Sequence, residues 1–130
     1  HQDHFDTIVL KDCLVDRTLS DMFLRDRSRT LRHLELLGLY LSGHDNDPNE
    51  DMTYFCKMLG RIASLKVLIL QDFVFESEFC SVKFIGRVVL RGAEIRVGLR
   101  QLIHNTGKWL PILTGKHEQL DMARMVGLMP

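Results

Sequence analysis

The sequence has little that would cross-link the chain or anchor it in a membrane. It contains three cysteines, Cys13, Cys56 and Cys80, which is an odd number at wide spacings without a C-x-x-C pair. This argues against a disulfide framework and a zinc knuckle, so we expect a reducing compartment, cytoplasmic or nuclear. No stretch reaches the ~18 uncharged apolar residues of a membrane span. The opening residues lack the pattern of a signal peptide, and because the first is His1 rather than Met we expect a fragment or a processed chain.

A net charge is also lacking. Seventeen Lys and Arg residues balance seventeen Asp and Glu residues, so charge gives no reason to predict binding to nucleic acid or membranes. The balance is uneven, because seven basic and three acidic residues lie from Ile85 onward. This polarity could face a partner, or it could be an accidental skew in a neutral protein.

What the sequence does contain is a leucine pattern between Thr30 and Ser42. Leucines stand at positions 31, 34, 36, 39 and 41, the arrangement of a leucine-rich repeat. In such a unit Leu34 and Leu36 point to one side of a short strand, and the alternate residues point to the other. One unit cannot bury its own leucines, so the pattern predicts neighbouring units.

Three further stretches fit the same template, although the last fits less well. The units start near 5, 31, 65 and 85, and the steps between them are irregular. The matching positions are Phe5, Ile8, Leu10, Cys13 and Val15, then Leu65, Leu68, Leu70, Phe73 and Phe75, then Ile85, Val88, Leu90, Ala93 and Ile95. At Cys13 we expect a small buried side chain under the bend after the strand.

Helices are predicted between these units. Residues 18–28 begin with a capping-box pattern and continue with apolar residues at helical spacing. Residues 52–62 form an amphipathic pattern, for which Asp47 is a suitable N-cap and Pro48 a suitable first helical residue. The alternation of Asp45, Asp47 and Asn49 resembles the start of a calcium loop, but Glu50 and Cys56 stand where that loop needs Gly and Glu.

After residue 96 the template ends. We expect a helix over 95–105 and a final short helix over 118–126. The predicted organisation is therefore repeat-like units over 1–95 and a C-terminal helical cap over 96–130, with room for disorder in the last ten residues. The predicted fold is α/β: a short leucine-rich-repeat solenoid with about four parallel strands on the concave side and helices on the convex side.

The order of these segments resembles the leucine-rich-repeat region of fungal F-box-like proteins. The resemblance covers about residues 5–95, and T-L-R-H-L-E-L at 30–36, L-x-L-S-G at 39–43 and the 52–62 helix leading to Ser64-Leu65 carry it. It implies that the repeats select a protein partner. In that family an F-box recruits the selected protein to a cullin–RING ubiquitin ligase, and no F-box is visible in this sequence.

The residues that alternate with the leucines form the predicted binding surface. In a parallel arrangement they line up in three rows: Thr7, His33, Val67 and Arg87; Val9, Glu35, Ile69 and Val89; Lys11, Leu37, Gln71 and Arg91. We predict a protein-binding face made of His33, Glu35, Leu37, Val67, Ile69, Gln71, Arg87, Val89 and Arg91, because an exposed apolar patch usually marks an interaction site. An acidic or extended protein segment is the predicted ligand. Alternatively, the C-terminal part or a preceding segment packs over this face.

Enzyme motifs are absent, and we predict no catalytic, cofactor or metal site. His117-Glu118 begins a zincin-like motif, but residue 121 is Asp where the second His ligand would stand. A Cys80–His104 nucleophile pair stays open, since such pairing is spatial. The favoured function is thus a non-enzymatic protein-interaction module, with a structural fragment of a longer repeat scaffold as the first alternative and a Cys/His-dependent enzyme as the second.

Overall fold

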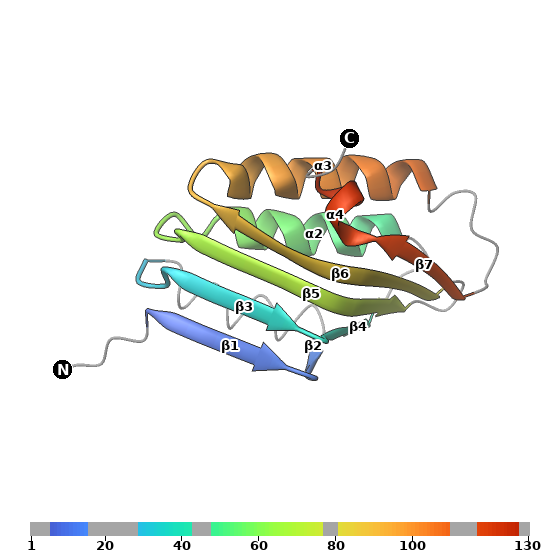
Figure 1. The fold of residues 1–130 in the computed structure, drawn as a ribbon, viewed down its shortest axis with the longest axis horizontal. Coiled ribbons are helices and arrows are strands. Elements are labelled where there is room, and N and C mark those ends of the chain that lie inside the picture. Colours follow the sequence, from blue (N-terminus) through green and yellow to red (C-terminus); the bar gives the residue numbers. More distant parts are fainter. Residues whose placement is uncertain (1–5, 16–28, 43–47, 77–80, 110–116, 128–130) are drawn as a thin grey trace.

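The computed structural model describes residues 6–15, 29–42, 48–76, 81–109 and 117–127, and it shows a mixed α/β fold (Figure 1). Described strands form one seven-stranded sheet in which parallel pairs predominate. The strands are β1 Thr7–Lys11, β2 Leu14–Val15, β3 His33–Leu37, β4 Tyr40–Ser42, β5 Val67–Glu76, β6 Ser81–Arg91 and β7 His117–Asp121. The helices are α2 Pro48–Gly60, α3 Glu94–Trp109 and α4 Met122–Met125.

Strands β1, β3 and β5 lie side by side, parallel and in register. Ile8 pairs with Leu34, and Leu34 pairs with Leu68. Leu34 and Leu68 are fully buried because the alternating leucines all point to the helix side of the sheet. The sequence template therefore predicted the alignment of these three strands correctly.

A short strand follows the bend after β1 and another follows the bend after β3. Strand β2 pairs with β4 in parallel, and β4 pairs in parallel with the C-terminal half of β5. Strand β5 is long enough to pair with both β3 and β4. Leu41 pairs with Phe75, and both are buried. Cys13 is half-buried, and its Sγ donates to the carbonyl of Lys11 at 3.1 Å, so it lies at the bend as predicted.

The strand predicted for the fourth unit is β6, and it runs in the opposite direction to the prediction. Strand β6 pairs with β5 antiparallel, with Leu90 beside Leu68 and Val88 beside Leu70. Only four residues separate β5 from β6, whereas a parallel crossover needs a dozen or more. The proposed unit start at Ile85 is also wrong, because that side chain is 37% exposed and lies in mid-strand.

Helices α2 and α3 lie on the same side of the sheet and complete one apolar core (Figure 1). Both were predicted, and Pro48 is the first residue of α2 as expected. Gly98 explains how closely α3 approaches the sheet: a Cβ there would lie only 2.7 Å from Cδ1 of Leu90. The glycine that weakens the helix as an isolated element thus allows it to pack on β6.

The C-terminal region differs from the predicted second helix. Residues 117–121 form β7, which pairs in parallel with β6 and so extends the sheet. Only the short α4 follows, and Asp121 caps it by accepting the backbone N–H groups of Ala123 and Arg124. The helical spacing of Leu120, Ala123 and Val126 gave the wrong prediction because β6 offers an edge with which β7 can pair.

Some predictions concern residues outside the described ranges. They are the helix over 18–28, the N-cap at Asp47 and the position of Cys80. Among the described helices, none combines the length and the apolar character that crossing a membrane requires.

Candidate functional site

All nine residues predicted to bind a partner lie on the face of the sheet opposite α2 and α3, which we call the open face. They are His33, Glu35, Leu37, Val67, Ile69, Gln71, Arg87, Val89 and Arg91. Arg87 and Arg91 are exposed, Ile69 is only 6% exposed, and the remaining six are half-buried. The middle of this face is thus partly apolar, and its rim is charged.

The reversal of β6 changes the rows of this face. The central row, Val9, Glu35, Ile69 and Val89, is as predicted. In the outer rows the two arginines exchange places: Arg91 lies beside Val67, and Arg87 lies beside Gln71. Arg87 therefore belongs to the row formed by the last residues of β1 and β3 and by Gln71 in the middle of β5.

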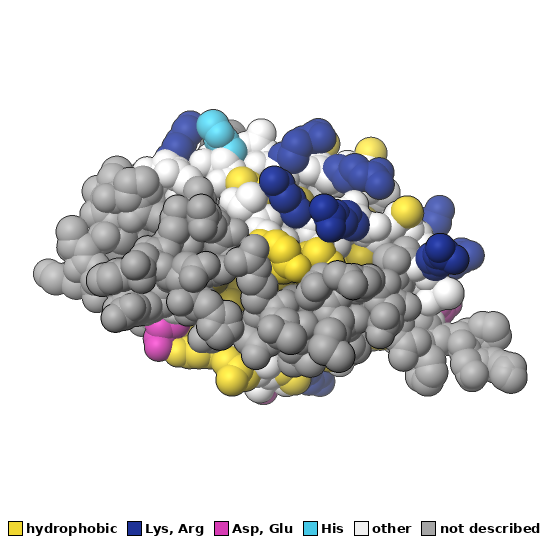
Figure 2. Space-filling view, turned by 180° about the vertical axis from the view of Figure 1, so that it is seen from behind, with side chains coloured by type: hydrophobic (Ala, Val, Ile, Leu, Met, Phe, Trp, Pro, Cys, Tyr) yellow, Lys and Arg dark blue, Asp and Glu magenta, His cyan; other side chains and the backbone are white. Residues whose placement is uncertain are grey.

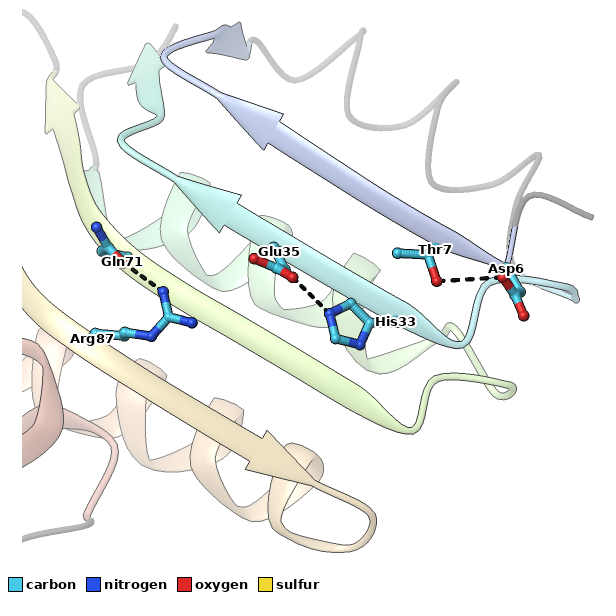
Figure 3. Close-up of polar contacts among 6 residues, drawn as sticks. All are labelled: Asp6, Thr7, His33, Glu35, Gln71 and Arg87. Atoms are coloured by element: carbon cyan, nitrogen blue, oxygen red, sulfur yellow. Dashed lines mark hydrogen bonds and ion pairs between the residues drawn. The ribbon is translucent and has the colours of Figure 1, made fainter.

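Two polar pairs fix side chains on the open face (Figure 3). A ring nitrogen of His33 lies 2.8 Å from a carboxylate oxygen of Glu35, two residues along β3. Across the β5–β6 ladder, the Arg87 guanidinium donates to the side-chain oxygen of Gln71 at 2.7 Å. These contacts hold the polar groups in place beside the apolar centre, which lowers the entropy that a partner would have to remove.

A hollow of about 690 Å³ opens where β1 and β3 end, beside the middle of β5. Leu37 and Gln71, both predicted binding residues, form part of its lining. The other lining residues are Lys11, Asp12, Gly38, Asp72, Lys83 and Ile85. The hollow combines two lysines, two aspartates and two apolar side chains, a mixture suited to a partner side chain with both polar and apolar parts.

Three of the residues that line this hollow have positive φ. Asp12, Gly38 and Asp72 have φ values of 49°, 66° and 44°, each just after the last residue of the β1–β3–β5 ladder in its strand. The N–H of Asp12 donates to Leu37 O and that of Gly38 to Gln71 O, so the ladder continues through the bend. The Asp72 carboxylate accepts the N–H of Gly86 at 2.7 Å.

Sequence reasoning missed this hollow although a signal was present. The three residues occupy the same offset in their units, two after the second strand leucine or its equivalent. Asp and Gly are among the residues that most readily adopt the left-handed conformation. Their recurrence at one offset marks a turn repeated at the same level in adjacent strands.

The described cysteines bear on the enzyme alternative. Burial raises the pKa of the Cys56 thiol to about 12, so the thiolate that acts as a nucleophile is scarce at neutral pH. Cys80 lies outside the described residues, so its pairing with His104 is not placed. Within the described ranges, no three His, Cys, Asp or Glu residues gather closely enough to hold a metal ion.

Comparison of the chain with known protein families, curated proteins and solved structures gives no match.

Proposed function

We propose that this protein is a non-enzymatic protein-interaction module and that the open face binds its partner. The observation that supports this proposal is the arrangement of that face, where the half-buried side chains of Leu37, Val67 and Val89 lie around Ile69, which is only 6% exposed. Polar pairs held in place border this apolar centre. A central apolar patch with a polar rim is the usual anatomy of a binding surface.

In this proposal the fold is a short leucine-rich-repeat stack of three parallel units that is closed by a returning strand. The support is the shared register of Ile8, Leu34 and Leu68 together with the left-handed residue at one offset in all three units. Such stacks present a continuous sheet face to their ligands. An extended protein segment that crosses the strands would meet all three rows in turn.

The resemblance to F-box-like proteins extends this proposal to a cellular role. The chain would be the substrate-recognition part of a ubiquitin-ligase adaptor in the cytoplasm or nucleus. The fold-level likeness names an architecture rather than a chemistry. The ligase role is therefore tested separately, by asking whether the proteins bound at the open face become ubiquitinated less when this chain is depleted.

One observation favours the scaffold alternative. Among the described strands β1 pairs only with β3, and its inward residues Ile8 and Leu10 are half-buried where Leu34 and Leu36 are buried. A further strand beside β1 would bury them. A scaffold would then associate through this edge, and Val9→Lys, at a side chain 44% exposed, would abolish that association.

The open face is tested by a double charge insertion. Val67→Glu places a carboxylate beside Ile69 along β5, and Val89→Glu places one across the ladder from it, without disturbing the buried side of the sheet. Ile69 itself is unsuitable because it is 6% exposed and its substitution would destabilise the fold. Ala63→Glu with Gln101→Glu is the matched control at exposed positions after α2 and on α3, outside the open face.

Affinity purification followed by mass spectrometry provides the readout. We expect the wild type and the control to capture the same specific partner and the open-face variant to lose it, while all three keep the same urea midpoint. Capture of that partner by the open-face variant would contradict the proposal.

A further inference from the structure

The helix layer carries a second charged surface on the opposite side of the molecule. Six exposed side chains of α2, α3 and the residue after α2 can carry positive charge there: Lys57, Arg61, Arg96, Arg100, His104 and Lys108. Figure 2, which views the molecule from behind, shows Lys and Arg side chains gathered on this side. We call these six residues the basic helix face.

The basic residues of α3 follow one another in a row that winds by about 40° at each step. On α3 they recur every four residues from Arg96 to Lys108, and four residues advance a helix by about 6 Å, so the stripe is roughly 18 Å long. Lys57 and Arg61 are likewise four apart. A Cβ at Gly60 would lie 3.9 Å from Cδ1 of Leu99, which places the end of α2 beside the part of α3 that carries Arg96 and Arg100.

These charges are not neutralised within the described part of the chain. No ion pair joins any of the six residues to a described carboxylate. Glu94 is the one acidic residue of α3, and its carboxylate accepts the N–H of Arg91. Like charges four residues apart destabilise a helix, and Arg96 in the first turn also opposes the helix dipole. In a chain with equal numbers of basic and acidic residues, overall composition does not account for this stripe.

We propose that the basic helix face docks an acidic segment of a protein partner. About six residues of extended chain span the length of the stripe, with alternate carboxylates in reach of Arg61, Arg96 and Arg100. Val97, which is 49% exposed on the same helix, offers an apolar contact between the charges. The described residues of this face include no exposed aromatic side chain on which bases could stack, which favours a peptide over single-stranded nucleic acid.

This surface is separate from the open face, because the sheet lies between them (Figure 1). One protein could therefore hold two partners at the same time. The inference does not depend on the open-face proposal, and either can fail alone.

The test uses fluorescence anisotropy with a labelled peptide of eight glutamates around one central valine. The variant R61E/R96E/R100E reverses the centre of the basic helix face. The control R29E/R32E/R124E makes the same change in net charge at exposed positions outside both the basic helix face and the open face. We expect the first to weaken binding at least tenfold and the control to stay within twofold of wild type. Equal losses, or a loss in the control alone, would overturn the proposal.

Two further measurements keep the result interpretable. The milder R61Q/R96Q/R100Q variant shows the same direction of effect with a wild-type urea midpoint, so a failure to fold cannot imitate the loss. A labelled single-stranded RNA and a short DNA duplex are titrated at the same ionic strength. Tighter binding of either nucleic acid than of the peptide would contradict the assignment of an acidic protein segment.

Discussion

Strands β5 and β6 are neighbours at the centre of the sheet, and both keep their leucines on the helix side, yet they run in opposite directions. In β5 the leucines at 68 and 70 are buried, and in β6 Val88 and Leu90 are buried equally well. The alternation of apolar residues therefore decides which face a side chain takes and is indifferent to strand direction. The length of the connection decides the direction.

The largest predicted effect is on the free energy of unfolding when the paired core leucines of the two strands are truncated. Leu68→Ala and Leu90→Ala should each lower the free energy of unfolding by about 3 kcal/mol, because both side chains are fully buried. Urea denaturation measures both values. If Leu90→Ala cost less than half of Leu68→Ala, the returning strand would be a weaker part of the core than its burial implies.

The bend after β3 gives the next largest effect. Gly38→Ala forces a left-handed alanine, at about 1–2 kcal/mol, and places a Cβ 2.6 Å from an Asp12 carboxylate oxygen. We expect a loss of about 2–3 kcal/mol. Gly92→Ala, at φ +56° with nothing within 4 Å, is the matched control after β6 and should cost only the backbone strain. In an Asp12→Ala background the two costs should become equal; a persistent difference would remove the role given to Asp12.

Gly98 tests how α3 rests on the returning strand. Gly98→Ala gains about 1 kcal/mol of helix propensity but crowds Leu90, and overpacking of this kind costs about 1–3 kcal/mol. The expected net result is a loss of about 1 kcal/mol in the wild type. In a Leu90→Ala background the space is free, so the same substitution should stabilise the protein. An unchanged sign in thermal or urea unfolding would show that Leu90 does not limit the approach.

The smallest effect concerns Cys56. Its pKa in the folded state is raised to about 12 by burial, so the thiol stays protonated in the folded state when that of the unfolded chain ionises. The associated stability is complete below pH 9 and declines as pH rises towards 12. Relative to Cys56→Ala, the wild type should lose about 1 kcal/mol between pH 9 and pH 10. A difference independent of pH would show that the thiol is accessible to solvent.

The sequence was sufficient to predict the parallel half of the fold. Leucine spacing predicted the pairing of β1, β3 and β5, and the capping pattern predicted α2. Both signals are local in the sequence, and the periodicity of apolar residues determines which side chains are buried. The sequence was insufficient for the strands after Glu76. There the same spacing of apolar residues is compatible with either strand direction, and only the four-residue connection between β5 and β6 favours the antiparallel one.

For the candidate site, the sequence placed the nine residues on one face but not in the correct rows. Arg87 and Arg91 lie on the predicted face because reversing a strand preserves the alternation of its side chains. Each arginine lies in the row that was predicted for the other. The hollow was missed because its lining depends on backbone conformation at Asp12, Gly38 and Asp72. The basic helix face needed the relative position of two helices, which no local pattern contains.

The most direct test of the open face is photo-crosslinking from single positions in cells. A photoreactive amino acid at position 35 or 67 faces the proposed partner, and one at position 63 or 101, after α2 or on α3, does not. The account predicts that the two open-face positions crosslink to one shared protein that the control positions leave unlabelled. Crosslinks to the same proteins from all four positions, or none from positions 35 and 67, would contradict it.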